Sequence, residues 1–299
     1  VVIDARTLPS GTVIELRNVE FAAVIGAVTV TGGAGSQVVV GDGSAQTIVL
    51  GADDDTLRGG GGNDFIGSEG GDDVLYGDDG DDTVTGGIGN DILYGNRQDD
   101  VLYGNQGDDT LFGGQDQDTL FGGQDRDVLH GNHGTDVLYG NLGDDVLYGN
   151  RDADTLFGGQ GADTLFGGQG DDVLYGGLGD DVLVGGQGAD TLTGGQGADT
   201  FRFNGPADGG DVITDFESGS DRIAIYSPGF GLTLTGTLPS GHFALDAPAG
   251  TLPTFVFNTR TGELSFDADG NGAGAAVAIA TLNVRSLSAS DIVLVGPGG

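Results

Sequence analysis

Residues 158–166, with the sequence Gly-Gly-Gln-Gly-Ala-Asp-Thr-Leu-Phe, show the unit from which most of the chain is built. A glycine-rich segment leads to Asp163, and a β-branched, an apolar and an aromatic residue follow it. Glycine and aspartate favour tight turns, whereas the last three residues favour an extended strand. The nonapeptide therefore predicts a six-residue turn and a three-residue strand, of which only the middle residue, Leu165, points inward.

Aspartate recurs at every ninth position over seventeen consecutive copies of this unit. Two residues after each aspartate lies an apolar residue, from Leu57 in the first copy to Phe201 in the last. A fixed short period is typical of a solenoid and argues against a disordered acidic tail. The recurring aspartates are Asp55, Asp64, Asp73, Asp82, Asp91, Asp100, Asp109, Asp118, Asp127, Asp136, Asp145, Asp154, Asp163, Asp172, Asp181, Asp190 and Asp199.

The composition argues against several classes of protein. Of the 299 residues 63 are glycine, 46 are acidic and ten are arginine; lysine is absent, and the formal charge is −36. Such a chain has no basic surface for nucleic acid, and no apolar run reaches the roughly 18 residues of a membrane span. Without cysteine it has no disulfide, thiolate zinc site or cysteine nucleophile. Aspartate outnumbers glutamate 41 to five, and short carboxylates between glycines suit Ca²⁺.

A single nonapeptide cannot hold itself in an ordered stack. Fixing nine residues costs about 9–18 kcal/mol of backbone entropy, whereas burying one leucine returns about 2–3 kcal/mol. The stacked aspartates also repel one another. A divalent cation between successive turns would neutralise the carboxylates and join the turns, so the sequence predicts bound Ca²⁺.

The repeats match the pattern Gly-Gly-x-Gly-x-Asp-x-apolar-x, and residues 55–203 resemble the RTX, or haemolysin-type calcium-binding, family. The resemblance implies an all-β fold, a right-handed parallel β-roll with two nonapeptides in each turn. The aspartates would then alternate between two edges, which begin at Asp55 and Asp64, and would bind calcium together with backbone carbonyls. Nine loops on one edge leave eight gaps and eight loops on the other leave seven, which predicts about 15 calcium ions, or about +30 against the formal −36.

Some repeats depart from the pattern. Asparagine replaces the second glycine at five places, which we expect to be mild because asparagine tolerates left-handed backbone. The prediction of an ion is weakest beside turns in which another residue replaces the glycine at the fourth position of the repeat. The extra aspartate before many repeat aspartates, as at Asp72 and Asp108, is interpreted as a solvated face. The two sets of replacements are Asn96, Asn105, Asn132, Asn141 and Asn150, and Gln98, Asp116, Asp125 and Asp152.

The segment before the repeats keeps the period without the carboxylates. Counting backward by nine places Gln46 and Gln37 at the aspartate position and Ile48, Val39, Val30 and Phe21 at the inward position. We therefore divide the chain into an N-terminal cap with calcium-free solenoid turns (1–54), the calcium-binding β-roll (55–203) and an irregular β cap (204–299). The apolar N-terminal end of a solenoid needs a cap or a partner.

The segment after Phe203 contains further acidic motifs. Residues 211–216, Asp-Val-Ile-Thr-Asp-Phe, and the following Asp221 resemble the region after the β-roll in serralysin-type secreted proteins. This resemblance implies that Asp211, Asp215 and Asp221 bind further calcium ions. Residues 267–272 resemble the start of an EF-hand loop (Asp267, Asp269, Asn271), but Ala278 stands where the loop needs a glutamate. A weak calcium turn and an ordinary turn therefore remain alternatives.

Two further features of the C-terminal segment concern its fold and its export. Residues 255–257 and 264–266 predict a β-hairpin. The tail 291–295, Asp-Ile-Val-Leu-Val, resembles the C-terminal signal of type I secretion substrates and equally fits a last β-strand.

Aromatic residues recur one position after the inward leucine, where side chains point outward. Two ladders result, and each either covers its sheet or packs against another copy or domain. His130 and His133 are interpreted as surface substitutions. The ladders are Tyr76, Tyr94, Phe112, Tyr148 and Phe166 on one sheet, and Tyr103, Phe121, Tyr139, Phe157 and Tyr175 on the other.

These observations favour a non-enzymatic protein, because no His-Glu-x-x-His or Gly-x-Ser-x-Gly motif is present. The first hypothesis is a secreted, calcium-folded structural protein, found extracellularly or at the cell surface. It would assemble with itself into a surface layer, matrix or filament through its aromatic faces and solenoid ends. The alternative is the C-terminal secretion and folding module of a larger exoenzyme or adhesin. Ice binding is disfavoured, since outward threonine pairs occur only at Thr83/Thr85 and Thr191/Thr193 within the repeats.

Overall fold

The computed structural model describes residues 1–9, 11–17, 19–248, 250–270 and 276–297. They form two compact units, Val1–Arg151 and Asp152–Gly299. In both units short strands alternate with turns, and the helical elements among the described residues are short 3-10 turns. The predicted all-β parallel solenoid is confirmed. No helix in these ranges is long and apolar enough to span a membrane.

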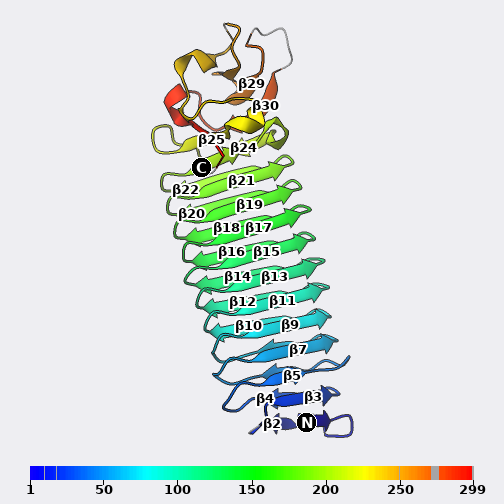
Figure 1. Ribbon diagram of the computed structural model, residues 1–299. Coiled ribbons are helices and arrows are strands. Elements are labelled where there is room, and N and C mark those ends of the chain that lie inside the picture. The colour runs from blue at the N-terminus through cyan, green and yellow to red at the C-terminus, as the bar shows by residue number, and fades with distance from the viewer. Residues whose placement is uncertain (10, 18, 249, 271–275, 298–299) are drawn as a thin grey trace. The chain divides into compact units, whose positions relative to one another are not determined.

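The first unit consists of two parallel sheets, and successive strands of the chain lie alternately in one sheet and in the other (Figure 1). Two such strands, one from each sheet, make one rung. Neighbouring strands of the repeat region pair eighteen residues apart, so that Leu93 lies between Leu75 and Leu111. The first sheet is ordered β1 (Val2–Asp4), β3 (Phe21–Ile25), β5 (Val38–Val40), β7 (Thr56–Gly61), β9 (Val74–Asp79), β11 (Ile92–Arg97), β13 (Thr110–Gln115), β15 (Val128–His133) and β17 (Val146–Arg151). The second is ordered β2 (Val13–Glu15), β4 (Thr29–Thr31), β6 (Thr47–Val49), β8 (Phe65–Gly67), β10 (Thr83–Ile88), β12 (Val101–Gln106), β14 (Thr119–Gln124) and β16 (Val137–Leu142).

The repeat strands are longer than the sequence predicts. Most contain six residues rather than three, because pairing continues into the glycine-rich segment, as where Asn96 faces Asp78 and Gly114. Two residues of most of these strands are therefore buried, for example Leu93 and Gly95 in β11. The leucines form the core of the repeat region: Leu75, Leu93 and Leu111 are fully buried.

The period shortens near the N-terminus, and one predicted core residue is wrong for this reason. Phe21 pairs with Val38 and Ala22 with Val39, a spacing of seventeen residues rather than eighteen. Ala22 is therefore fully buried, whereas the Phe21 side chain is 52% exposed. The other predicted inward residues, Val30, Val39 and Ile48, are fully buried.

The second unit begins with the same type of rung and ends in an irregular cap. Its hairpin of β28 (Thr254–Phe257) and β29 (Glu263–Asp267) confirms the prediction, with Phe255 opposite Phe266. Residues 292–295 form the last strand, which pairs in parallel with β25 (Arg222–Tyr226) and buries Ile292 and Leu294. One sheet is ordered β19 (Thr164–Gln169), β21 (Val182–Gln187), β23 (Thr200–Phe203), β25 (Arg222–Tyr226), β31 (Ile292–Val295) and β26 (Gly236–Thr237). The other is ordered β18 (Thr155–Gln160), β20 (Val173–Leu178), β22 (Thr191–Gln196), β24 (Asp211–Ile213), β30 (Val277–Leu282), β29 (Glu263–Asp267), β28 (Thr254–Phe257) and β27 (Phe243–Leu245).

Candidate metal centre

The repeat aspartates lie in buried columns along the two sides of the roll where the strands begin, each aspartate immediately before a strand. All seventeen are at most 3% exposed. Within each unit, the backbone N–H of one aspartate donates to Oδ1 of the aspartate one turn later, as from Asp64 to Asp82 (2.7 Å) and from Asp82 to Asp100 (2.8 Å). In the first unit one column runs from Asp55 to Asp145 and the other from Asp64 to Asp136. The predicted alternation between two edges is thus present in the structure.

The second carboxylate oxygen, Oδ2, lies close to the first glycine of its own turn. Within the described residues, Oδ2 of Asp64, Asp100 and Asp118 is buried and accepts no hydrogen bond. Glycine leaves the room for it: a Cβ atom on Gly59 would lie 2.5 Å from Asp64 Oδ2 and 2.7 Å from the carbonyl oxygen of Gly77. The arrangement recurs at Gly77, where a Cβ would lie 2.5 Å from Asp82 Oδ2.

These oxygens fit calcium. A buried carboxylate oxygen without a donor is costly unless a cation balances it, and carboxylate and backbone carbonyl oxygens are the ligands that Ca²⁺ prefers. In the described part of the chain, no three His, Cys, Asp or Glu side chains gather around one point. Each ion would therefore take most of its oxygens from the backbone of the turns, with aspartate supplying the negative charge.

The electrostatics of the columns also favour a cation. Burial above all, and then neighbouring carboxylates, raise the pKa of Asp100 to about 9 and that of Asp118 to about 8. Burial raises the pKa of Asp64 to about 7 and that of Asp91 to about 6. Ionising these groups at neutral pH without a counter-ion would therefore oppose folding.

The turns that depart from the repeat pattern keep its backbone. Asn96 and Asn141 adopt φ angles of 86° and 78°, in the left-handed region normally occupied by glycine. The replacements at the fourth glycine position also have positive φ, as at Gln98 (70°) and Asp116 (75°). The expectation that the asparagine replacements are mild is confirmed for the backbone, and the weaker prediction of ions beside Gln98, Asp116, Asp125 and Asp152 stays a prediction.

The additional aspartates are exposed, as predicted. Asp72 and Asp108 face solvent. Their Oδ1 atoms accept the backbone N–H groups of Asn90 and Arg126, eighteen residues later (2.8 and 3.0 Å). They therefore cap the next turn at the surface and are separate from the buried columns.

The three C-terminal aspartates occupy different environments. Asp211 extends one column: it is buried, its Oδ1 accepts the N–H of Asp190 (3.1 Å), and burial raises its pKa to about 8. Asp221 extends the other column by accepting the N–H of Asp199 (3.1 Å), but its Oδ2 also accepts the N–H of Glu217 (2.7 Å). Asp215 lies outside the columns and accepts the N–H groups of Gly194 and Gly195 (2.9 and 2.8 Å). Asp211 therefore resembles a repeat aspartate most closely.

The EF-hand-like segment is only partly described. Asp267 is buried and its Oδ1 accepts the N–H groups of Asp269 (3.3 Å) and Gly270 (3.1 Å), which closes a tight turn. Asn271, the third oxygen donor considered from the sequence, lies outside the described residues.

The aromatic ladders form continuous stacks within the first unit, and His130 belongs to one of them. The rings of Tyr76, Tyr94 and Phe112 are nearly parallel, with centroids 4.7–5.0 Å apart. His130 continues this stack between Phe112 (4.9 Å) and Tyr148 (4.7 Å). Its role was missed in the sequence, although its position eighteen residues after Phe112 and before Tyr148 is a sufficient signal.

Comparisons with known proteins find a family match over the repeat region and two similar solved structures. Models of the RTX calcium-binding nonapeptide repeat match residues 31–66, 40–75, 68–93, 85–120, 112–147, 139–174, 148–183 and 175–205. A search of curated proteins finds no match. Among solved structures, the chain is similar to the AlgE6R3 subunit of the mannuronan C5-epimerase from Azotobacter vinelandii, with 34% identity over 48% of this chain and 80% of that one (TM-score 0.34). It is also similar to the AlgE6R2 subunit, with 26% identity over 51% of this chain and 94% of that one (TM-score 0.34).

The matched repeats together cover residues 31–205, more than half of the chain, and include all the buried aspartate columns of the nonapeptides. The chain therefore belongs to the RTX calcium-binding nonapeptide repeat family.

Proposed function

We propose that this chain is a secreted structural protein whose β-roll folds when it meets extracellular calcium. The observation that carries the proposal is the pair of aspartate columns, in which buried carboxylates stack at every turn with Oδ2 turned toward backbone carbonyls. The seventeen repeat aspartates, with Asp211 and Asp221 extending the two columns, would be the calcium ligands. Asp215 belongs to the same proposal as a ligand near the last rungs.

The columns make folding depend on the ion. When calcium is scarce, the carboxylates repel one another and their burial is unfavourable, so the chain stays open and suited to export. At the millimolar calcium concentrations outside cells, the ions bind between the rungs, and their binding free energy becomes folding free energy. In this proposal the role of the ions is structural rather than catalytic, and about 15 of them would bind in the repeats.

Calorimetric titration of chelator-treated chain with CaCl₂ tests this proposal. We expect cooperative binding of many ions per chain, together with a gain of β-structure over the same calcium range. A chain that binds only one or two ions, or whose β-structure does not follow the binding, would contradict it.

The second candidate function is self-assembly, favoured by apolar exposure at the N-terminal end. β1 and β2 are the terminal strands of their sheets in the described residues, and Val2 and Val13 are 70% and 61% exposed there. Phe21 on the neighbouring strand adds a half-exposed ring. Exposed apolar side chains on neighbouring strands are suited to contact with another strand or subunit.

Sedimentation of the calcium-loaded chain separates the two roles. A subunit of a surface layer, matrix or filament would form larger species as the protein concentration rises, and Val13→Lys would suppress them. A strict monomer at high concentration would instead favour a folding and secretion module of a larger exoenzyme or adhesin.

A further inference from the structure

A glutamine replaces aspartate at the N-terminal start of both columns. Gln37 precedes Asp55 by one turn and Gln46 precedes Asp64 by one turn, and both are buried. Their backbone N–H groups donate to Oδ1 of Asp55 and Asp64, each over 2.6 Å. The two glutamines are therefore members of the same hydrogen-bonded columns, but they bring an amide instead of a charge.

The Gln37 side chain fills its own turn from within. Its Nε2 donates to the carbonyl oxygens of Gly33 (3.1 Å) and Gly35 (2.7 Å). Its Oε1 lies 2.5 Å from the Cβ position of Gly32, just as Asp64 Oδ2 lies 2.5 Å from that of Gly59. The amide thus keeps an oxygen in the carboxylate's place and adds N–H donors that face the carbonyl oxygens of the turn.

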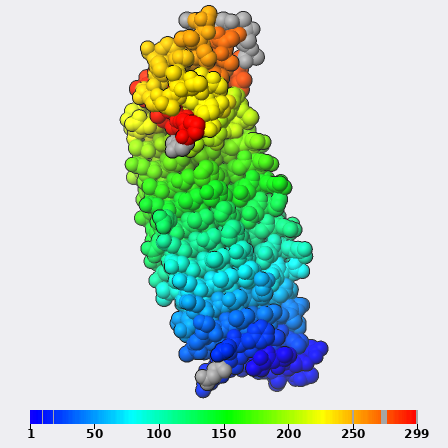
Figure 2. Space-filling model, viewed as in Figure 1, coloured from blue at the N-terminus to red at the C-terminus, as the bar shows by residue number. Residues whose placement is uncertain are grey.

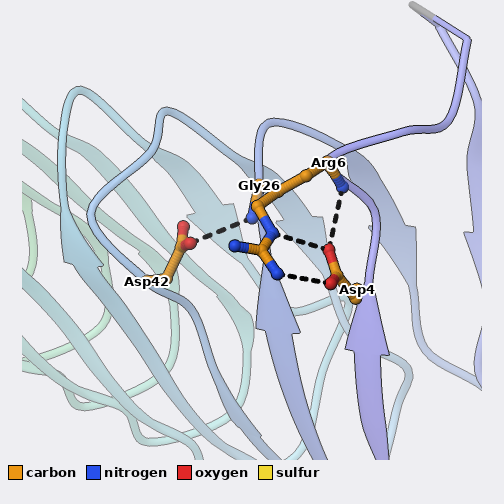
Figure 3. A network of polar contacts seen from close by, with 4 residues as sticks. All are labelled: Asp4, Arg6, Gly26 and Asp42. Carbon is orange, nitrogen blue, oxygen red and sulfur yellow. Dashed lines mark hydrogen bonds and ion pairs between the residues drawn. The ribbon is translucent and has the colours of Figure 1, made fainter.

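The Gln46 side chain forms its hydrogen bond with a carboxylate of its own turn, that of Asp42. Its Nε2 donates to Oδ1 of Asp42 (2.5 Å), which also accepts the N–H of Ser44 (3.0 Å). The other Asp42 oxygen accepts the N–H of Gly26 (3.0 Å), and Arg6, paired with Asp4, lies close by (Figure 3). Amide and backbone N–H groups therefore satisfy this carboxylate without a metal ion.

We propose that the side-chain amides of Gln37 and Gln46 take the place of the next calcium ion in each column, so that metal binding begins at Asp55 and Asp64. An amide nitrogen supplies a positive partial charge to oxygen acceptors and carries no net charge that needs balancing. A carboxylate at the same position has no N–H to donate, so a cation would have to balance its oxygens and the carbonyl oxygens of the turn. This inference rests on the proposed function, because it assumes that the aspartate turns bind calcium.

Counting calcium ions per chain by native mass spectrometry tests the proposal on the full chain. Gln37→Asp should bind one ion more than the wild type, and Gln37→Asp with Gln46→Asp should bind two more. Gln115→Asp is the matched control: it adds the same charge at the exposed last residue of β13 and should leave the count unchanged.

The converse variant keeps the proposal testable if the Gln37→Asp chain does not fold. Asp64 lies in a turn whose glycines match those around Gln37, so Asp64→Gln should lose one ion and keep the β-structure. A wild-type count in folded Gln37→Asp or folded Asp64→Gln would overturn the inference. A wild-type chain that binds no calcium would instead overturn the proposed function.

Discussion

The backbone N–H of Asp55 donates to the carboxylate Oδ1 of Asp73, eighteen residues later, over 2.6 Å. This bond makes the aspartate a part of the stacking ladder as well as a source of charge. One oxygen holds the neighbouring rung, and the other is turned toward the turn interior. The same arrangement recurs down each column, as where the N–H of Asp91 donates to Oδ1 of Asp109 (2.8 Å).

Asp100→Asn should weaken calcium binding and, without calcium, favour the folded state. The amide replaces a carboxyl group whose pKa burial raises to about 9, and it keeps the size of the side chain. We expect a loss of about 1.5–3 kcal/mol of stability in calcium, the range for an interaction with a charged group. Urea unfolding in CaCl₂ and in EGTA measures both effects. The control is Asp99→Asn at the adjacent exposed aspartate; equal effects at the two positions would contradict the account.

Gly77→Ala should destabilise the roll by roughly 1–3 kcal/mol, the usual cost of overpacking. The new methyl group would lie 2.5 Å from Asp82 Oδ2 and 3.0 Å from the carbonyl oxygen of Gly95, which the turn cannot move without disturbing the column. Gly43→Ala is the matched control, since no atom lies within 4 Å of its Cβ position. Thermal unfolding in calcium compares the two variants, and a Gly77→Ala midpoint as high as that of Gly43→Ala would argue against the crowded site.

Acid should have opposite effects with and without calcium. Burial raises the folded-state pKa of Asp64 to about 7 and of Asp118 to about 8, above the unfolded value near 3.9. Protonation of these groups therefore adds to the stability of the metal-free fold. The added stability is complete below about pH 4 and is lost as the pH rises through 7–8. Calcium-free chain should gain β-structure as the pH falls from 8 to about 4, whereas the calcium concentration needed for folding should rise. Circular dichroism across this pH range measures both, and a metal-free signal that declines on acidification would contradict the prediction.

His130→Ala should open a gap in the aromatic stack and cost roughly 1–3 kcal/mol, because two ring contacts of about 0.5–1.5 kcal/mol each are lost. His130→Phe should keep the stack and the stability. The control is His133→Ala, at the exposed last residue of the same strand, β15. Urea unfolding of the three variants in calcium provides the comparison; an equal loss for His130→Phe and His130→Ala would show that stacking is not the cause.

The sequence predicts the repeat region well because every rung repeats the same local rules. The spacing of the aspartates and leucines alone places Asp64 at an edge and Leu93 in the core. The six-residue strands were not predicted, since glycine propensity favours turns, whereas in the stack Asn96 and its neighbours pair with the adjacent rungs. Phe21 was placed wrongly because a single missing residue in one turn moves every preceding side chain by one position.

The environments of the C-terminal aspartates could not be obtained from spacing. Asp211 and Asp221 follow their predecessors by 21 and 22 residues, yet both rejoin the columns, because the intervening loops change length while the rungs still stack. Asp215 lies only four residues from Asp211 and bonds to backbone N–H groups instead. Figure 2 shows one face of the molecule as a space-filling view, in which the colour distinguishes the repeat region (cyan to green) from the C-terminal residues (yellow to red).

If the buried aspartate columns require calcium, the fold should be lost and regained with the ion. The most direct measurement is far-UV circular dichroism of the full chain in CaCl₂, after EGTA, and after calcium is restored, with MgCl₂ as the control for a smaller ion that demands octahedral geometry. The account predicts loss of the β-signal in EGTA and its recovery with calcium but not with magnesium. A spectrum and a thermal midpoint that EGTA leaves unchanged would contradict it.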